Sequence, residues 1–163
     1  MTHPLEPAIK IFWHNSWMLR NAVADLEPGQ ASYKMENCNS YDRIVCHIAA
    51  SRRGLSQSLG IEVPTPDWED SGDFKLAAQF DESQPCPPVA DLMEAFAAIS
   101  EAMVAGMEVM SLEDLLAPSP MPIPGEDPTL LDLVAFFAMH ESYHIGQLAV
   151  IGKCMGRKGV MGA

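Results

Sequence analysis

The sequence lacks any run of 18 or more apolar residues, which is about the shortest stretch that reads as a membrane-spanning helix. Basic residues are scarce as well, because 10 lysines and arginines stand against 22 aspartates and glutamates, for a formal net charge of −12. A surface of this charge repels the phosphate backbone of nucleic acids. We therefore expect neither a membrane nor a nucleic acid among the partners of this chain.

Several processing and pairing signals are also missing. The N-terminus has no basic stretch followed by an apolar one, so we expect no secretory signal peptide and a cytoplasmic protein. The four cysteines show no C-x-x-C spacing, and in a reducing compartment we expect free thiols that pack in the core. No β-branched alternation of useful length suggests a strand. The 163 residues fit one domain, 1–163, that is large enough to bury a core.

Apolar residues at steps of three and four are present in four segments, which predicts four helices. These cover about residues 7–26, 40–59, 87–110 and 128–155, with Asp127 as the expected cap of the last helix. The fold class we predict is all-α, a four-helix bundle with long irregular connections after helices two and three. Those connections permit a topology other than simple up-down-up-down, and the first of them has room for a short helix at 74–80.

The pair His140 and His144 is the most informative feature of the sequence. Residues four apart on a helix lie on one face, with Cβ atoms roughly 5–6 Å apart, so both imidazoles can bind one metal ion. Both also lie on the apolar seam of the last predicted helix, where an ionisable side chain needs a partner.

The five residues His140–His144 match the zinc-protease motif H-E-x-x-H in the literal sense. A zinc protease needs a third ligand further along the chain. Only 19 residues follow His144, and none of them is Asp, Glu or His. We therefore consider the protease interpretation the weakest alternative and look for the third ligand upstream.

His47 is the best candidate for that third ligand. It lies in the middle of the apolar face of the second predicted helix, whereas His3 lies near the terminus and His14 falls off the apolar stripe of the first helix. A lone inward histidine is more often a satisfied core residue. Three inward histidines in one bundle favour a shared cation instead, so we predict a metal site at His47, His140 and His144.

Two segments resemble a known family. His140–Leu148 (HESYHIGQL) is similar to the H-x-x-x-H-x-G-Q signature of the DinB-like superfamily, also called DinB/YfiT-like metalloenzymes, and Cys46–Ser51 resembles its helix-two segment with a single histidine. The resemblance follows the helix order over nearly the whole chain. It implies a four-helix bundle with an open three-histidine site that binds a divalent metal, nickel or zinc, and it implies a homodimer.

The resemblance indicates the site more firmly than the chemistry. Characterised relatives include S-transferases and isomerases that use a low-molecular-weight thiol such as mycothiol or bacillithiol. We therefore expect a metal-dependent enzyme for a small-molecule substrate, either a thiol-dependent S-transferase or a hydrolase. The alternative is a non-catalytic metal-binding or small-molecule-binding bundle, and no sequence feature separates the two. Specific catalytic residues are not indicated.

Two further residues are placed near the predicted metal. Gln147 follows His140 on the same seam and could bind a water or substrate there. Glu141 is rotated about 100° from His140 and flanks the seam. It could face the substrate as a helper base, but a surface carboxylate is the simpler interpretation.

Overall fold

The structure is a computed structural model that describes residues 3–66, 86–125 and 127–162. Four long helices dominate it: α1 (Glu6–Val23), α2 (Tyr41–Ser58), α4 (Val89–Val109) and α6 (Leu130–Cys154). A single helical turn, α5 (Leu112–Leu115), lies in the connection after α4. The described residues contain no strand, only one isolated bridge between Pro118 and Thr129. The predicted all-α four-helix bundle is confirmed, while the short helix expected at 74–80 falls outside the described residues.

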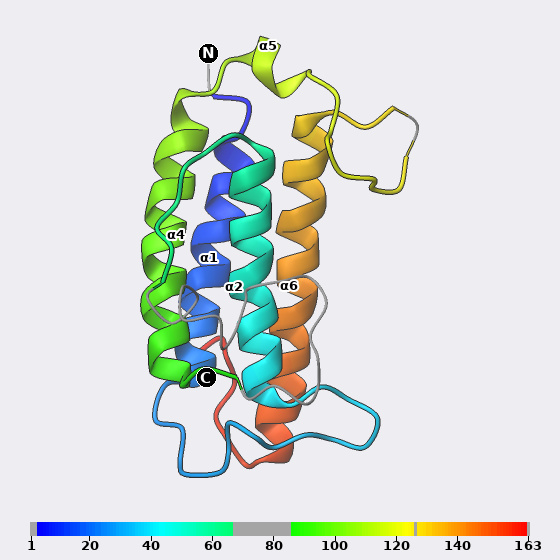
Figure 1. Ribbon diagram of the computed structural model, residues 1–163. Coiled ribbons are helices and arrows are strands. Elements are labelled where there is room, and N and C mark those ends of the chain that lie inside the picture. Colours follow the sequence, from blue (N-terminus) through cyan, green and yellow to red (C-terminus); the bar gives the residue numbers. More distant parts are fainter. Residues whose placement is uncertain (1–2, 67–85, 126, 163) are drawn as a thin grey trace.

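The helices form a ring in which α6 lies between α1 and α2, and α4 closes the other side. Figure 1 shows that α1 and α6 run down the bundle whereas α2 and α4 both run up it. The parallel pair α2 and α4 requires a connection that returns along the whole bundle. The helix order therefore differs from up-down-up-down, as the long connections permit. Among the described helices, none combines the length and apolarity needed to cross a lipid bilayer.

The start of α6 differs from the prediction. Thr129, not Asp127, caps the helix: its hydroxyl accepts a hydrogen bond from the Asp132 backbone N–H, and the Asp132 carboxylate accepts one from the Thr129 N–H at 2.9 Å. This reciprocal pair is a capping box. Asp127 instead has a φ of 45°, a left-handed conformation that aspartate tolerates better than most residues.

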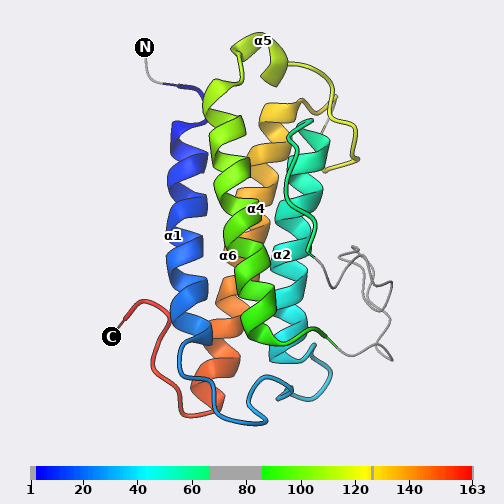
Figure 2. The same ribbon diagram turned by 60° about the vertical axis from the view of Figure 1, so that its left-hand side comes forward.

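The first part of the long connection packs against the bundle. After α2 ends, residues 61–66 run back down alongside α2 and α4 (Figure 2). Gly106 of α4 makes this close approach possible, since a Cβ atom at that position would lie 2.7 Å from the side chain of Ile61. A substitution of Gly106 would push the returning segment away from the helix.

The buried apolar side chains form two clusters, separated by a buried polar layer. One cluster contains residues near the lower ends of α2 and α6, among them Ile44, Ile145 and Leu148, and the other contains upper residues such as Leu55 and Leu133. The polar side chains that are buried are Asn15, Ser16, Arg52, Ser56 and Glu141. Of the four cysteines, only Cys46 is fully buried as expected, while Cys38 and Cys154 are exposed.

Candidate metal centre

The side chains of His47, His140 and His144 converge at the junction of α2 and α6. The Nε2 atom of His140 lies 3.3 Å from Nε2 of His47 and 3.1 Å from Nε2 of His144. One ligand nitrogen from each residue falls within 4.8 Å of the others. Two nitrogens bound at about 2.0–2.1 Å to one tetrahedral ion lie about 3.3–3.4 Å apart. The spacing of the three imidazoles therefore fits a single metal ion.

Two helices place these side chains. His140 and His144 are one turn apart on α6, so their rings lie side by side with centroids 4.4 Å apart. His47 projects from α2, which packs directly against α6, and its ring centroid lies 4.4 Å from that of His144. All three side chains are half-buried, which leaves one side of the cluster accessible.

The electrostatic environment favours neutral imidazoles. Burial, reinforced by the charges that His144 and His140 would carry, lowers the pKa of His47 to about 4. Burial also lowers the pKa of His140 and of His144, although the hydrogen bond to Gln147 opposes the shift at His144. Neutral imidazole is the form that binds metals, so protons compete weakly for these nitrogens near neutral pH.

Gln147 sets the tautomer of His144. Its side-chain oxygen lies 2.7 Å from Nδ1 of His144, and its amide nitrogen donates to the hydroxyl oxygen of Tyr143 at 3.1 Å. Because the amide oxygen can only accept, Nδ1 of His144 carries the proton. The lone pair of that ring is then on Nε2, which points to the other two histidines. Orientation of a ligand histidine through its second nitrogen is common at metal sites.

His140 is the central member of the cluster, because its Nε2 atom faces both other rings while its Nδ1 atom points away from them. Its Nδ1 atom is buried and has no hydrogen-bond partner in the described part of the chain. Phe136 stacks on the ring with centroids 5.9 Å apart, so the apolar side of the imidazole is well packed. Three neutral rings with converging Nε2 atoms cannot satisfy one another fully, whereas a cation accepts all three lone pairs.

Glu141 does not lie at the surface, so its interpretation as a flanking surface carboxylate is wrong. It is 2% exposed, and its two carboxylate oxygens accept hydrogen bonds from Arg52 at 2.6 and 2.7 Å. The carboxylate therefore faces the interior of the bundle, while His140 beside it faces the other histidines. The structure brings Gln147 to the histidines but turns Glu141 away from them. Arg52, the partner that holds Glu141, was not predicted as a functional or core residue.

The remaining two histidines are not part of the cluster. His14 is exposed on α1. His3 is more ordered than a frayed terminus, because its Nε2 atom lies 2.9 Å from the Met110 carbonyl oxygen and its Nδ1 accepts a hydrogen bond from the Leu5 backbone N–H. His3 thus fastens the start of α1 to the end of α4.

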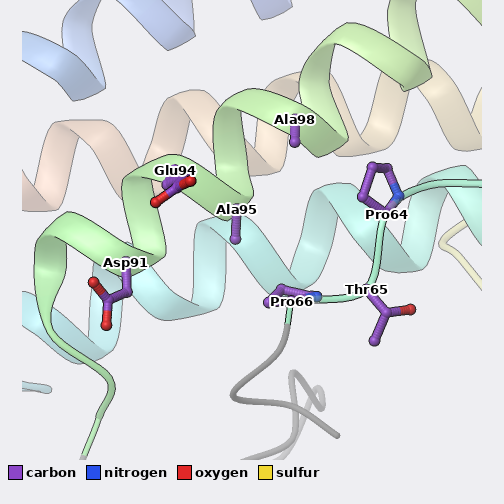
Figure 3. Close-up of a pocket in the computed structure, with 7 residues that line it drawn as sticks. All are labelled: Pro64, Thr65, Pro66, Asp91, Glu94, Ala95 and Ala98. Carbon is purple, nitrogen blue, oxygen red and sulfur yellow. The ribbon is translucent and has the colours of Figure 1, made fainter.

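A separate hollow of about 250 Å³ lies between residues 64–66 and α4. Figure 3 shows this returning segment passing Ala95 and Ala98, with Asp91 and Glu94 further along the helix. Its described lining contains two carboxylates but none of the three histidines. We therefore take the histidine cluster as the candidate site.

Comparison with known proteins agrees with this geometry. The model of the DinB superfamily matches residues 7–148. Among solved structures, YfiT from Bacillus subtilis is similar, with a TM-score of 0.66 and 16% sequence identity over 94% of this chain and 88% of that chain. YfiT is described as a probable metal-dependent hydrolase with an unusual four-helix bundle topology. No curated protein sequence gives a significant match.

Proposed function

Because the chain belongs to the DinB superfamily and brings three histidine nitrogens to one point, we propose that it is a divalent-metal enzyme that hydrolyses a small molecule. The observation that carries this proposal is the convergence of the three Nε2 atoms with the His144 tautomer held by Gln147. The description of YfiT as a probable metal-dependent hydrolase supports the same class of reaction.

The roles of the residues follow from their positions. His47, His140 and His144 hold the ion and leave the accessible side of the cluster for water and substrate. A divalent ion held by these three neutral imidazoles would supply Lewis acidity, which could lower the pKa of a bound water or polarise a carbonyl group. Gln147 keeps His144 in its ligand tautomer. Tyr143 accepts the hydrogen bond from Gln147, and its hydroxyl hydrogen is therefore directed elsewhere and can be donated to a substrate oxygen.

The three nitrogen ligands limit which metal ions fit the site but do not identify a single one. Three imidazoles suit zinc and nickel, and the same ligands also suit iron and copper. We propose zinc or nickel, as the family resemblance suggests. Calcium and magnesium are disfavoured, because both prefer oxygen ligands and the cluster offers only nitrogen.

An activity screen tests the proposal against its rivals. The protein loaded with Zn²⁺ or Ni²⁺ is given panels of small esters and amides, with and without a low-molecular-weight thiol. We expect hydrolysis that requires the metal and does not require the thiol. Product formation that consumes thiol would identify an S-transferase instead. A metal-loaded protein that turns over nothing would favour the non-catalytic binding bundle.

Two variants control the screen. His140→Ala removes the central ligand and should abolish metal-dependent turnover. His14→Ala removes an exposed histidine outside the cluster and should leave turnover unchanged. Equal activity in both variants would show that the observed hydrolysis does not come from this site.

A further inference from the structure

A hollow of about 650 Å³ lies next to the histidine cluster, between the loop that joins α1 to α2 and the lower half of α6. This volume is within the range of small-molecule binding sites, about 300–1,000 Å³. Figure 1 shows the α1–α2 loop crossing the lower turns of α6 before the chain enters α2. The hollow therefore lies at the lower end of the bundle, beside the candidate metal centre.

Shared residues connect the hollow to the metal centre. Gln147 lines the hollow and also binds Nδ1 of His144 at 2.7 Å. Tyr143 lines it as well, and its ring packs edge-on against His144 with centroids 5.1 Å apart. On the other helix, Ile44 of the lining lies one turn before His47. A molecule bound in the hollow would touch the residues that orient a metal ligand.

The lining is uncharged, although the chain carries a net charge of −12. None of the described residues that form it is acidic or basic. Its apolar residues include Val150, which is 56% exposed, and Tyr143, which is 60% exposed. Asn37 and Asn39 add neutral hydrogen-bonding groups. Exposed apolar side chains with a few neutral polar groups are typical of a site for an uncharged ligand.

The loop that forms one wall is held in place by backbone hydrogen bonds. The N–H of Tyr41 donates to the carbonyl of Tyr33 at 2.9 Å, and the N–H of Asp42 donates to that of Ala31 at 2.8 Å. Arg157 from the C-terminal segment donates to the Gln30 side-chain oxygen at 2.9 Å. The loop is thus fixed both to the start of α2 and to the C-terminal segment. These hydrogen bonds hold one wall of the hollow in place.

Gly146 keeps the α6 wall of the hollow open. It lies in the interior of α6, where glycine is less favourable than alanine for the helix. A Cβ atom at this position would meet nothing within 4 Å, so packing does not explain the glycine. Any larger side chain here would project into the hollow.

We propose that this hollow is the substrate subsite of the histidine centre and that it binds the apolar group of an uncharged substrate. The inference rests on the proposed hydrolytic function for the reaction, but the binding itself does not require the metal. A charged group at this position is disfavoured, because the lining offers no counter-charge to replace the hydration that is lost.

A pair of fluorescent probes tests the binding. N-phenyl-1-naphthylamine is uncharged, whereas 8-anilinonaphthalene-1-sulfonate has the same ring system with an added sulfonate. We expect saturable binding of the uncharged probe, about tenfold or more tighter than that of the sulfonate. Gly146→Leu should weaken the uncharged probe about tenfold or more without lowering the thermal midpoint, since leucine favours the helix.

A matched control introduces the same leucine side chain at a position outside the hollow. Ala105→Leu adds a large side chain to an exposed position of α4, outside the hollow, and should leave probe binding unchanged. His140→Ala should bind the uncharged probe like the wild type. A wild-type protein that binds the uncharged probe but takes up no Zn²⁺ or Ni²⁺ would overturn the proposed function alone. Wild-type probe affinity in Gly146→Leu would overturn the subsite alone.

Two exposed cysteines provide an independent footprint within one molecule. Cys38 lines the hollow, and Cys154 lies at the end of α6 outside it. Saturating N-phenyl-1-naphthylamine should slow the alkylation of Cys38 by N-ethylmaleimide, measured by mass spectrometry, and leave Cys154 unchanged. Equal rates at Cys38 with and without the probe would show that the probe binds elsewhere.

Discussion

Arg52 and Glu141 form a bidentate ion pair in the middle of the bundle, with nitrogen–oxygen distances of 2.6 and 2.7 Å. Both side chains are at most 2% exposed. The guanidinium also donates to the Phe12 carbonyl at 2.7 Å and lies 4.3 Å from the centre of the Phe96 ring. One arginine therefore joins α1, α2, α4 and α6 at the level of the histidine cluster.

Loss of one partner of this pair should destabilise the protein strongly. Arg52→Met leaves the Glu141 carboxylate buried without its donor, and we expect the free energy of unfolding to fall by about 3–5 kcal/mol. Urea denaturation followed by circular dichroism measures this. Lys10→Met, which removes the exposed partner of Glu6, is the matched control and should have little effect.

The double variant separates charge burial from packing. When Arg52→Met is combined with Glu141→Leu, no charge remains buried, and most of the lost stability should return. A double variant as unstable as the sum of the single variants would show that the contacts of each side chain, and not the uncompensated charge, dominate.

The sequence did not reveal Arg52, for a physical reason. Apolar periodicity identifies the buried face of α2 through Ile44, Ile48 and Leu55, but a charged residue beside that face is assigned to solvent by default. Arg52 could have been found only by considering two helices together. Arg52 and Glu141 are opposite charges that each lie one residue from the inward face of two helices that pack together.

The second prediction concerns Gln147. Gln147→Leu removes the acceptor that fixes the proton on Nδ1 of His144, so the affinity for Zn²⁺ should fall about 10–100-fold. Competition with a chromophoric chelator measures the dissociation constant. Gln147→Glu keeps an acceptor at the same place and should retain the affinity.

The matched control for Gln147 is an exposed glutamine on the other helix. Gln57→Leu near the end of α2 should leave Zn²⁺ affinity unchanged. Equal affinities of the wild type and Gln147→Leu would contradict the role of the His144 hydrogen bond.

The third prediction separates this site from a zinc protease. In a protease the glutamate after the first histidine is the general base. Here both oxygens of Glu141 are occupied by Arg52. The metal-loaded protein should not cleave casein, and folded Glu141→Gln should keep its metal content. Metal-dependent casein cleavage that disappears in Glu141→Gln would restore the protease interpretation.

Helix positions were predictable because the local signals were strong, whereas the details around them depend on tertiary contacts. Sequence alone favours Asp127 as the cap of α6 over Thr129, since both residue types are good caps and only the Asp132 carboxylate decides between them. The three histidines are brought together as the helix faces predicted. The hollow was not foreseeable, because a loop without periodicity forms one of its walls.

The fourth prediction is that the protein is a homodimer. Trp13 on α1 is 61% exposed. Ile11 of α1 and Met139 of α6 are exposed as well and line one shallow hollow. Trp17 is partly covered by the C-terminal segment at Gly162, so Trp13 is the better interface candidate. Light scattering should give twice the chain mass of 17.8 kDa.

Variants of two exposed apolar residues distinguish a specific interface from nonspecific association. Trp13→Gln should weaken the dimer about tenfold or more, as loss of a central aromatic does at interfaces. Val109→Gln removes an exposed apolar residue of α4 and should not change the dimer. A monomer at high micromolar concentration would contradict the prediction.

The central claim is that His47, His140 and His144 hold one divalent metal ion, and the metal content of the His47→Ala variant tests it most directly. His47 is the ligand that α2 contributes, so its role depends on the packing of α2 against α6. Elemental analysis should find about one zinc or nickel per chain in the wild type and in His14→Ala, and far less in His47→Ala. A His47→Ala protein that is folded and retains the full wild-type metal content would contradict the account.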